Sequence, residues 1–236
     1  RPAMKVDKFR TVIIYIIIIL LGLVCLLPLL NIVAISFSSS AAVEGNMVGL
    51  IPVGFSTAAY EKILEDSQFW HSFLISVERV VLTLIINFVL IVLMAYPLSK
   101  TNAQFRGRNI YANLMIFAML FNGGMIPTFL LVKSYGLLNT VWALVLPGAV
   151  PIFNVILVMN FFAAVPKELE EAAFIDGANP LQVLTKIFIP ISKPVLATVS
   201  LFSIVGSWND FYSGLIYMSK ATYYPLMTYI QSLQIN

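Results

Sequence analysis

The chain has 236 residues, of which 60% are hydrophobic and 11% are charged, and its net charge at pH 7 is +3. A soluble domain carries about twice this charged fraction, so the composition favours burial in lipid. The small net charge gives no reason to expect nucleic-acid binding, and the single cysteine, Cys25, cannot supply an intramolecular disulfide framework. We therefore expect one polytopic, all-α membrane domain.

The first ten residues, 1–10, form a short basic segment that we expect to be truncated, because residue 1 is Arg and the first Met is at position 4. Residues 11–35 contain no charged side chain. At about 1.5 Å per residue, this run can cross the roughly 30 Å of hydrocarbon in a bilayer. It is too long for the apolar core of a signal peptide. We predict a membrane span here, followed by a polar outer segment at 36–71.

Four further apolar runs along the chain are long enough to be spans: 73–98, 110–132, 141–165 and 195–218. Residues 11–236 are thus predicted to form the membrane domain. Five spans place the two ends on opposite sides of the membrane, so we expect a sixth span to be missing from the C-terminal end.

The distribution of Lys and Arg between loops predicts the orientation, because cytoplasmic loops are enriched in positive charge. One set of alternate loops holds most of these residues: Arg1, Lys5, Lys8, Arg10, Lys100, Arg106, Arg108, Lys167, Lys186 and Lys193. The other set holds only Lys62, Lys133 and Lys220. The N-terminus and the loops at 99–109 and 166–194 are therefore predicted to be cytoplasmic.

The segment at 166–194 is predicted to form a helical hairpin. Its first residues are Pro and several Glu, which suit a helix N-terminus. Gly177 is expected to end this helix, and Asn179 with Pro180 to start the next as N-cap and first-turn residue. Pro190 is expected to stop the second helix.

The hairpin carries carboxylates without a histidine, a nucleophile or metal-ligand spacing, so we expect no catalytic residue and no metal site. One interpretation is a solvated amphipathic loop. The other is a docking element, which is favoured by positions that stand at fixed spacing: Glu171, Ala172, Ala173, Gly177, Ile187 and Pro190.

This spacing resembles the E-A-A, x3, G, x9, I-x-L-P motif in permease subunits of binding-protein-dependent ABC importers, with Ile189 in place of Leu. The resemblance covers nearly the whole chain and is closest to carbohydrate importers of the maltose-permease type, in the oligosaccharide branch. Supporting stretches are AYPLSK at 95–100, the segment 125–148 and GSWNDF at 206–211. It implies a type I ABC importer transmembrane domain in the bacterial cytoplasmic (inner) membrane.

The resemblance also implies the partners: a second homologous permease subunit, two ATPase subunits and an extracytoplasmic sugar-binding protein. The hairpin would then be the coupling helix that docks on an ATPase subunit. This chain has no P-loop motif, so ATP and Mg²⁺ are expected to bind to the ATPase subunits, with no cofactor in this chain. It is expected to be a pore-forming subunit and not an enzyme. An ABC permease for an amino acid or a peptide is the alternative function, and a secondary transporter is a further one.

We expect the solute path to be lined by polar side chains within the spans: Asn122, Asn154, Asn209 and Asp210. Asp210 is the clearest candidate, because an ionisable group inside a span is a functional hypothesis by default. Nearby Pro and Gly residues would break the helices, as transporters do around midplane sites. Helix packing by small residues and ordinary proline kinking are the alternative explanations.

Charged residues near the outer end of the second span have two possible roles. Arg79 either attracts an acidic sugar or extends to the outer interface as a snorkelling side chain. His71 is expected to be an interfacial residue, since no second metal ligand is evident.

Overall fold

The computed structural model describes residues 8–121 and 123–235, which form helices joined by turns and loops, with no strand among them. The chain divides into two compact units, residues 1–67 and 68–236. The helical architecture confirms the predicted fold class. The expected N-terminal segment, 1–10, lies largely outside the described residues.

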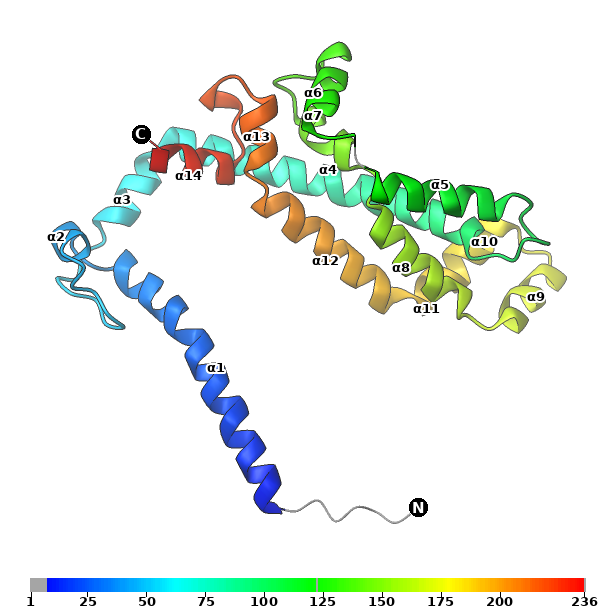
Figure 1. Cartoon of the computed structure of the whole chain (residues 1–236), viewed down its shortest axis with the longest axis horizontal. Helices are drawn as coiled ribbons and strands as arrows, with labels where there is room; N and C mark the ends of the chain where they lie inside the picture. Colours follow the sequence, from blue (N-terminus) through cyan, green and yellow to red (C-terminus); the bar gives the residue numbers. More distant parts are fainter. Residues whose placement is uncertain (1–7, 122, 236) are drawn as a thin grey trace. The chain divides into compact units, whose positions relative to one another are not determined.

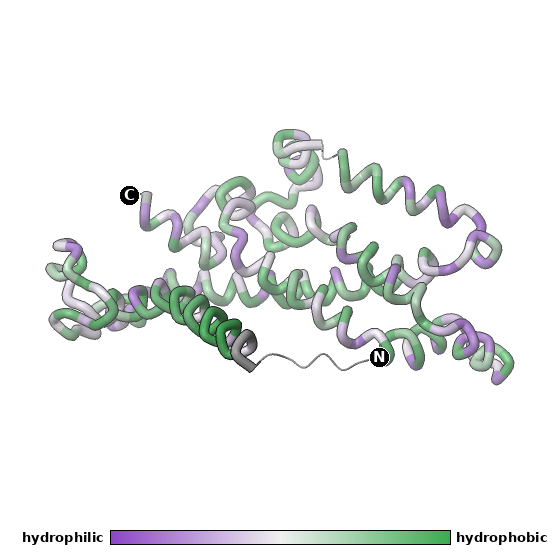
Figure 2. The backbone as a smooth tube through the Cα atoms, turned by 60° about the horizontal axis from the view of Figure 1, so that its bottom comes forward, coloured by the Kyte–Doolittle hydropathy of each residue, from purple (hydrophilic) through white to green (hydrophobic). Residues whose placement is uncertain are grey.

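The first unit is built from α1 (Lys8–Ser36), α2 (Ser40–Glu44) and α3 (Ala58–Glu65). The predicted span at 11–35 is one long helix, and Figure 2 shows that its residues are hydrophobic along nearly all of its length. Its apolar side chains are exposed along its length, as expected of a helix that meets lipid or another chain.

The second unit begins with α4 (Ser67–Leu98), which contains the predicted span at 73–98. Polar residues on α4 recur every three or four positions and are buried: Ser72, Ser76, Arg79, Thr83 and Asn87. This spacing places them on one face of the helix. The face turns apolar toward the C-terminal end of α4, where Ile91 and Ala95 enter a hydrophobic core.

The other predicted spans are broken helices: α5 (Arg108–Leu120) with α6 (Met125–Ser134), and α7 (Val141–Val145) and η1 (Leu146–Gly148) with α8 (Ile152–Ala163). The bend before α8 is 48°. It lies at Pro147 and Pro151, which lack the N–H that a continuous helix needs. Among the described residues, two helices are long and apolar enough to cross a membrane, or up to five spans if each bent pair counts as one.

The hairpin consists of α9 (Lys167–Ile175), α10 (Pro180–Val183), the π-helical η2 (Leu184–Phe188) and α11 (Ile189–Ile191). Gly177 ends the first helix as predicted, with a φ of 84°. Asn179 forms the predicted cap, since its Oδ1 accepts a hydrogen bond from the Gln182 N–H. The helix ends one residue later than the predicted stop at Pro190, because the chain stays helical to Ile191. Pro190 follows directly after the π-helical turn, where the regular pattern of helix hydrogen bonds is already interrupted.

The chain then bends by 84° into α12 (Lys193–Asn209), followed by α13 (Tyr212–Tyr217), η3 (Ala221–Tyr223) and α14 (Leu226–Ile235). The predicted span at 195–218 is therefore not one helix. It is interrupted at Asp210, whose backbone is extended.

Two apolar clusters hold the second unit together. In Figure 1, α7 and α13 lie near one end of this unit and the hairpin helices α9, α10 and α11 lie at the other. The larger cluster joins α4, α8, α12 and the hairpin, and includes the buried Phe162 and Phe188. The smaller one joins α6, α7 and α13 around Leu144 and Tyr217. A polar cavity lies between the two clusters. Leu144 of the smaller cluster lines it, and so does Asn87, which lies one turn of α4 before Ile91 of the larger cluster.

Candidate functional site

The polar cavity has a volume of about 240 Å³ and is bounded by α4, the break before α8, and α12. Polar side chains that line it come from α4, from α8 and from α12 with the residue after it: Arg79, Thr83, Asn87, Asn154, Ser203, Ser207 and Asp210. Helix breaks bring Gly148, Pro151 and Asp210 to its wall. Irregular backbone of this kind is tolerated at membrane depth where it lines a cavity.

Arg79 and Asp210 form an ion pair at the cavity wall. Arg79 Nη2 donates to Asp210 Oδ2 at 2.5 Å, and Nη1 donates to the Asp210 carbonyl at 3.0 Å. Asp210 Oδ1 also accepts from the Ser213 N–H at 3.1 Å, in the first turn of α13. The carboxylate therefore caps a helix and neutralises a buried cation.

Arg79 behaves differently from both sequence-based interpretations. It is 4% exposed, so it does not snorkel to an interface. Its positive charge is already paired with Asp210, so it presents no free cation to an acidic sugar. The pair was not predicted because its members are 131 positions apart in the chain.

The predicted path residues are partly brought together. Asn154 is buried and lines the cavity with Asp210, whereas Asn209 is exposed and is absent from the cavity wall. Asn122 lies outside the described residues. Thr83 and Asn87 also line the cavity and were missed, although the regular spacing of polar residues in an apolar span was a usable signal.

A second cluster fixes the hairpin to the end of α4. Lys100 Nζ lies 2.7 Å from both Glu170 carboxylate oxygens, and Tyr96 Oη donates to Glu170 Oε1 at 3.2 Å. The Lys100 ammonium lies 4.1 Å from the centre of the Tyr96 ring and 4.3 Å from that of Phe188. Burial lowers the pKa of Lys100, while the hydrogen bond and charge of Glu170 act in the opposite direction. The cluster joins α4 to both arms of the hairpin.

The tip of the hairpin is exposed. Glu171 and Ala172 face outward, Ala173 is half-buried against the core, and Gly177 forms the exposed turn. Ile175, beside them, is 86% exposed. The other motif residues differ, since Ile187 is half-buried and Pro190 is exposed.

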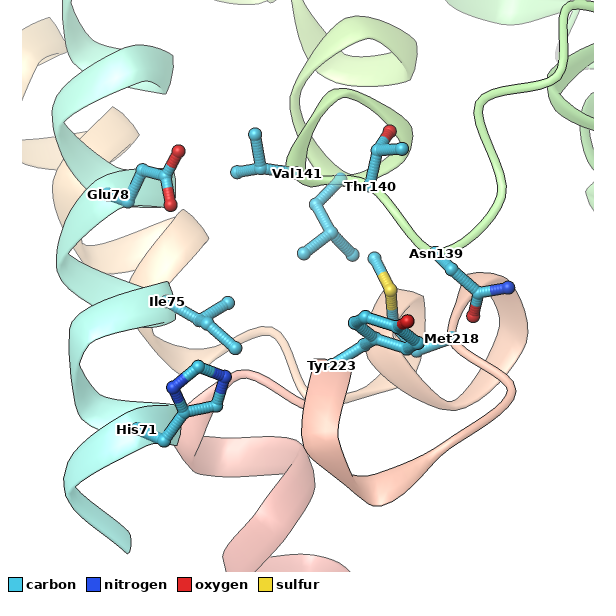
Figure 3. A pocket seen from close by; sticks show the side chains of 9 residues that line it. His71, Ile75, Glu78, Asn139, Thr140, Val141, Met218 and Tyr223 are labelled. Atoms are coloured by element: carbon cyan, nitrogen blue, oxygen red, sulfur yellow. The ribbon is translucent and has the colours of Figure 1, made fainter. Parts of the chain in front are cut away.

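A further cavity, of about 230 Å³, lies at the end of the unit away from the hairpin. Figure 3 shows His71 and Glu78 on α4 facing Thr140 and Tyr223 across it. His71 is exposed. Among the described residues, no group of His, Cys, Asp and Glu side chains could hold a metal ion.

Comparison with known families gives a match over residues 82–236 to the family described as "Binding-protein-dependent transport system inner membrane component". The matched segment includes the hairpin and every residue that lines the polar cavity except Arg79.

Individual relatives agree. Protein LplC of Bacillus subtilis (strain 168) is 42% identical over 214 residues, covering 91% of this chain and 72% of the relative. The polygalacturonan/rhamnogalacturonan transport system permease protein YtcP of the same organism is 40% identical over 229 residues, covering 97% of this chain and 79% of the relative.

One solved structure is similar over the whole chain. It is described as a bacterial ABC transporter involved in the import of the acidic polysaccharide alginate, with a TM-score of 0.89 and 33% sequence identity. The match covers 100% of this chain and 84% of the other. The chain therefore belongs to the binding-protein-dependent transport system inner membrane components, the permease subunits of ABC importers, as its hairpin motif predicted.

Proposed function

We propose that this permease subunit moves an oligosaccharide across the cytoplasmic membrane and that its hairpin couples this movement to ATPase subunits. One observation carries the proposal: α4 lines the polar cavity with Arg79, Thr83 and Asn87, and the chain directly after it is locked to the hairpin through Lys100. One continuous helix thus connects the cavity with the hairpin.

The partners follow from the family and from the surface of the chain. The exposed Glu171, Ala172 and Gly177 would dock on one of two ATPase subunits, which bind ATP and Mg²⁺. A second homologous permease would complete the path, and an extracytoplasmic binding protein would deliver the sugar. The basic loops support a cytoplasmic location for the hairpin and the N-terminus.

The mechanism can be written for the residues of this chain. When the ATPase subunits move the hairpin, the Lys100–Glu170 pair carries the displacement to α4. Because α4 and α12 meet at Asn87 and Ser203, whose side chains are hydrogen-bonded at 3.1 Å, a shift of α4 changes the cavity wall. The backbone breaks at Pro151 and Asp210 would allow the flanking helices to reorient.

The transport functions in the names of the relatives support a sugar over other solutes. They include a diacetylchitobiose uptake permease of Streptomyces coelicolor, 29% identical over 216 residues. An amino-acid or peptide permease, or a secondary transporter, is not favoured by these names.

Reconstitution tests the proposal. The chain is assembled in proteoliposomes with its partner permease, ATPase subunits and binding protein, and ATP hydrolysis is measured with neutral oligosaccharides, acidic oligosaccharides and peptides. We expect at least one oligosaccharide to stimulate ATP hydrolysis. The same oligosaccharide should cross the membrane from the side that holds the binding protein and accumulate on the side that holds the ATPase subunits. Stimulation by peptides with none by any sugar would exclude the carbohydrate assignment.

A further inference from the structure

Three polar atoms on one face of α4 have no hydrogen-bond partner within the described residues: Arg79 Nε, Thr83 Oγ1 and Asn87 Oδ1. Their residues are 4%, 8% and 4% exposed, and all three line the polar cavity. Leaving such a group unsatisfied costs about 1–3 kcal/mol each. Buried polar groups in proteins nearly always have a partner, so these three atoms are available to hydrogen-bond with a molecule bound in the cavity.

The spacing of the three residues defines the shape of that molecule. They recur every fourth position, which on a helix is a rise of about 6 Å per step along one face. A ligand that contacts all three is therefore extended along α4, with hydrogen-bonding groups repeated along its length. A single ion or a compact solute cannot span this distance.

The hydrogen-bonding types of the three atoms define its chemistry. Arg79 Nε can only donate, Asn87 Oδ1 can only accept, and the Thr83 hydroxyl can do both. A sugar hydroxyl both donates and accepts, so a row of hydroxyls satisfies all three. A carboxylate only accepts, and it would leave Asn87 Oδ1 without a partner.

The charge of the cavity also favours hydroxyl groups over carboxylates. Asp210 already neutralises Arg79 through two hydrogen bonds. The cavity therefore offers no free cation to a sugar carboxylate. A second carboxylate near Asp210 would be repelled.

We propose that Arg79, Thr83 and Asn87 form a recognition site for the hydroxyl groups of an uncharged sugar unit, and that Asp210 keeps sugar carboxylates out of it by occupying Arg79. This inference rests on the proposed oligosaccharide transport and adds to it the class of sugar unit that this subunit recognises.

The first test replaces Thr83 with Val, which removes the unpartnered hydroxyl and keeps the volume. The matched control is Thr198→Val on α12, where the hydroxyl is exposed and outside the cavity. Equilibrium binding of labelled diacetylchitobiose, a neutral probe, is measured on the complete detergent-solubilised assembly. We expect Thr83→Val to weaken binding by about two- to tenfold with an unchanged or higher Tm, and the control to bind like the wild type.

Equal binding of diacetylchitobiose by the two Val variants would overturn the proposed recognition site, because the Thr83 hydroxyl would then contact water and not the sugar. ATP-driven uptake that persists in that case would leave the proposed function intact, so the two failures are distinguishable.

The second test replaces Asp210 with Asn, which removes the negative charge that neutralises Arg79. Binding of digalacturonate, an acidic probe, is compared with that of diacetylchitobiose on the same assembly. We expect the acidic-to-neutral affinity ratio to rise by about tenfold or more, since a hydrogen bond to a charged group is stronger than a neutral one. An unchanged ratio in a folded variant would overturn the role of Asp210. If this variant does not fold, the Thr83→Val comparison still decides whether the site exists.

Discussion

Lys100 and Glu170 are 70 positions apart in the chain, yet they form an ion pair in which the ammonium group contacts both carboxylate oxygens and both side chains are nearly buried. Tyr96 and Phe188 surround the ammonium group. Glu170 stands beside Glu171, which is exposed. The two adjacent carboxylates thus have different environments: Glu170 fixes the hairpin to α4, and Glu171 is accessible to a partner protein.

Replacing Lys100 with Met should destabilise the hairpin. The Glu170 carboxylate would remain buried without its cation, and breaking one side of a buried pair costs about 3–5 kcal/mol. We expect a lower Tm of the purified assembly and a lower ratio of sugar uptake to ATP hydrolysis.

The double variant Lys100→Met with Glu170→Leu is the control for this prediction. It removes both charges, so it should recover much of the lost stability. If the hairpin transmits movement only through this pair, the double variant should still show poor coupling. A double variant no more stable than Lys100→Met would contradict the ion-pair explanation.

Gly177 should tolerate Asn better than Val. Its φ of 84° lies in the left-handed region, which costs a β-branched residue more than it costs Asn. No atom lies within 4 Å of an added Cβ, so the strain comes from the backbone and not from a clash. We expect Gly177→Val to lose co-purification with the ATPase subunit and Gly177→Asn to keep most of it. Equal co-purification would show that the turn is not needed for docking.

Glu171→Ala should weaken association with the ATPase subunit without changing the Tm of the isolated permease. The side chain is exposed and at the start of the motif, so its loss removes a surface contact and no internal one. Glu168→Ala is the matched control, since Glu168 is an exposed acid one turn earlier on α9. The affinity of the permease for a surface-immobilised ATPase subunit should fall for Glu171→Ala alone. The same loss in both variants would indicate only a general charge effect.

Gly214→Ala should destabilise the protein, whereas Gly206→Ala should leave its stability unchanged. A Cβ at Gly214 would collide with the fully buried Thr228, whose hydroxyl donates to the Phe211 carbonyl at 2.8 Å. Overpacking of this kind costs about 1–3 kcal/mol. A Cβ at Gly206 meets nothing within 4 Å and enters the cavity. Thermal unfolding should show a lower Tm for Gly214→Ala, and an unchanged Tm with reduced uptake for Gly206→Ala.

Local chemistry explains why the hairpin could be predicted in detail. The cap formed by Asn179 and the turn at Gly177 depend on residues within a few positions of each other, so their side-chain and backbone preferences decide the geometry. The helix runs one residue past Pro190 because a π-helical turn directly before it interrupts the regular hydrogen-bond pattern, and the sequence did not reveal this turn.

The helical membrane fold, the polar hairpin and the family could be predicted from the sequence, because apolar runs, caps and a motif of fixed spacing are local properties. Which polar residues share a site became known from the packing of the helices. It joined Arg79 to Asp210 and Lys100 to Glu170, and it excluded Asn209 from the cavity. A buried charge needs a partner in space and not in sequence, so the partner is known only when the helices have packed.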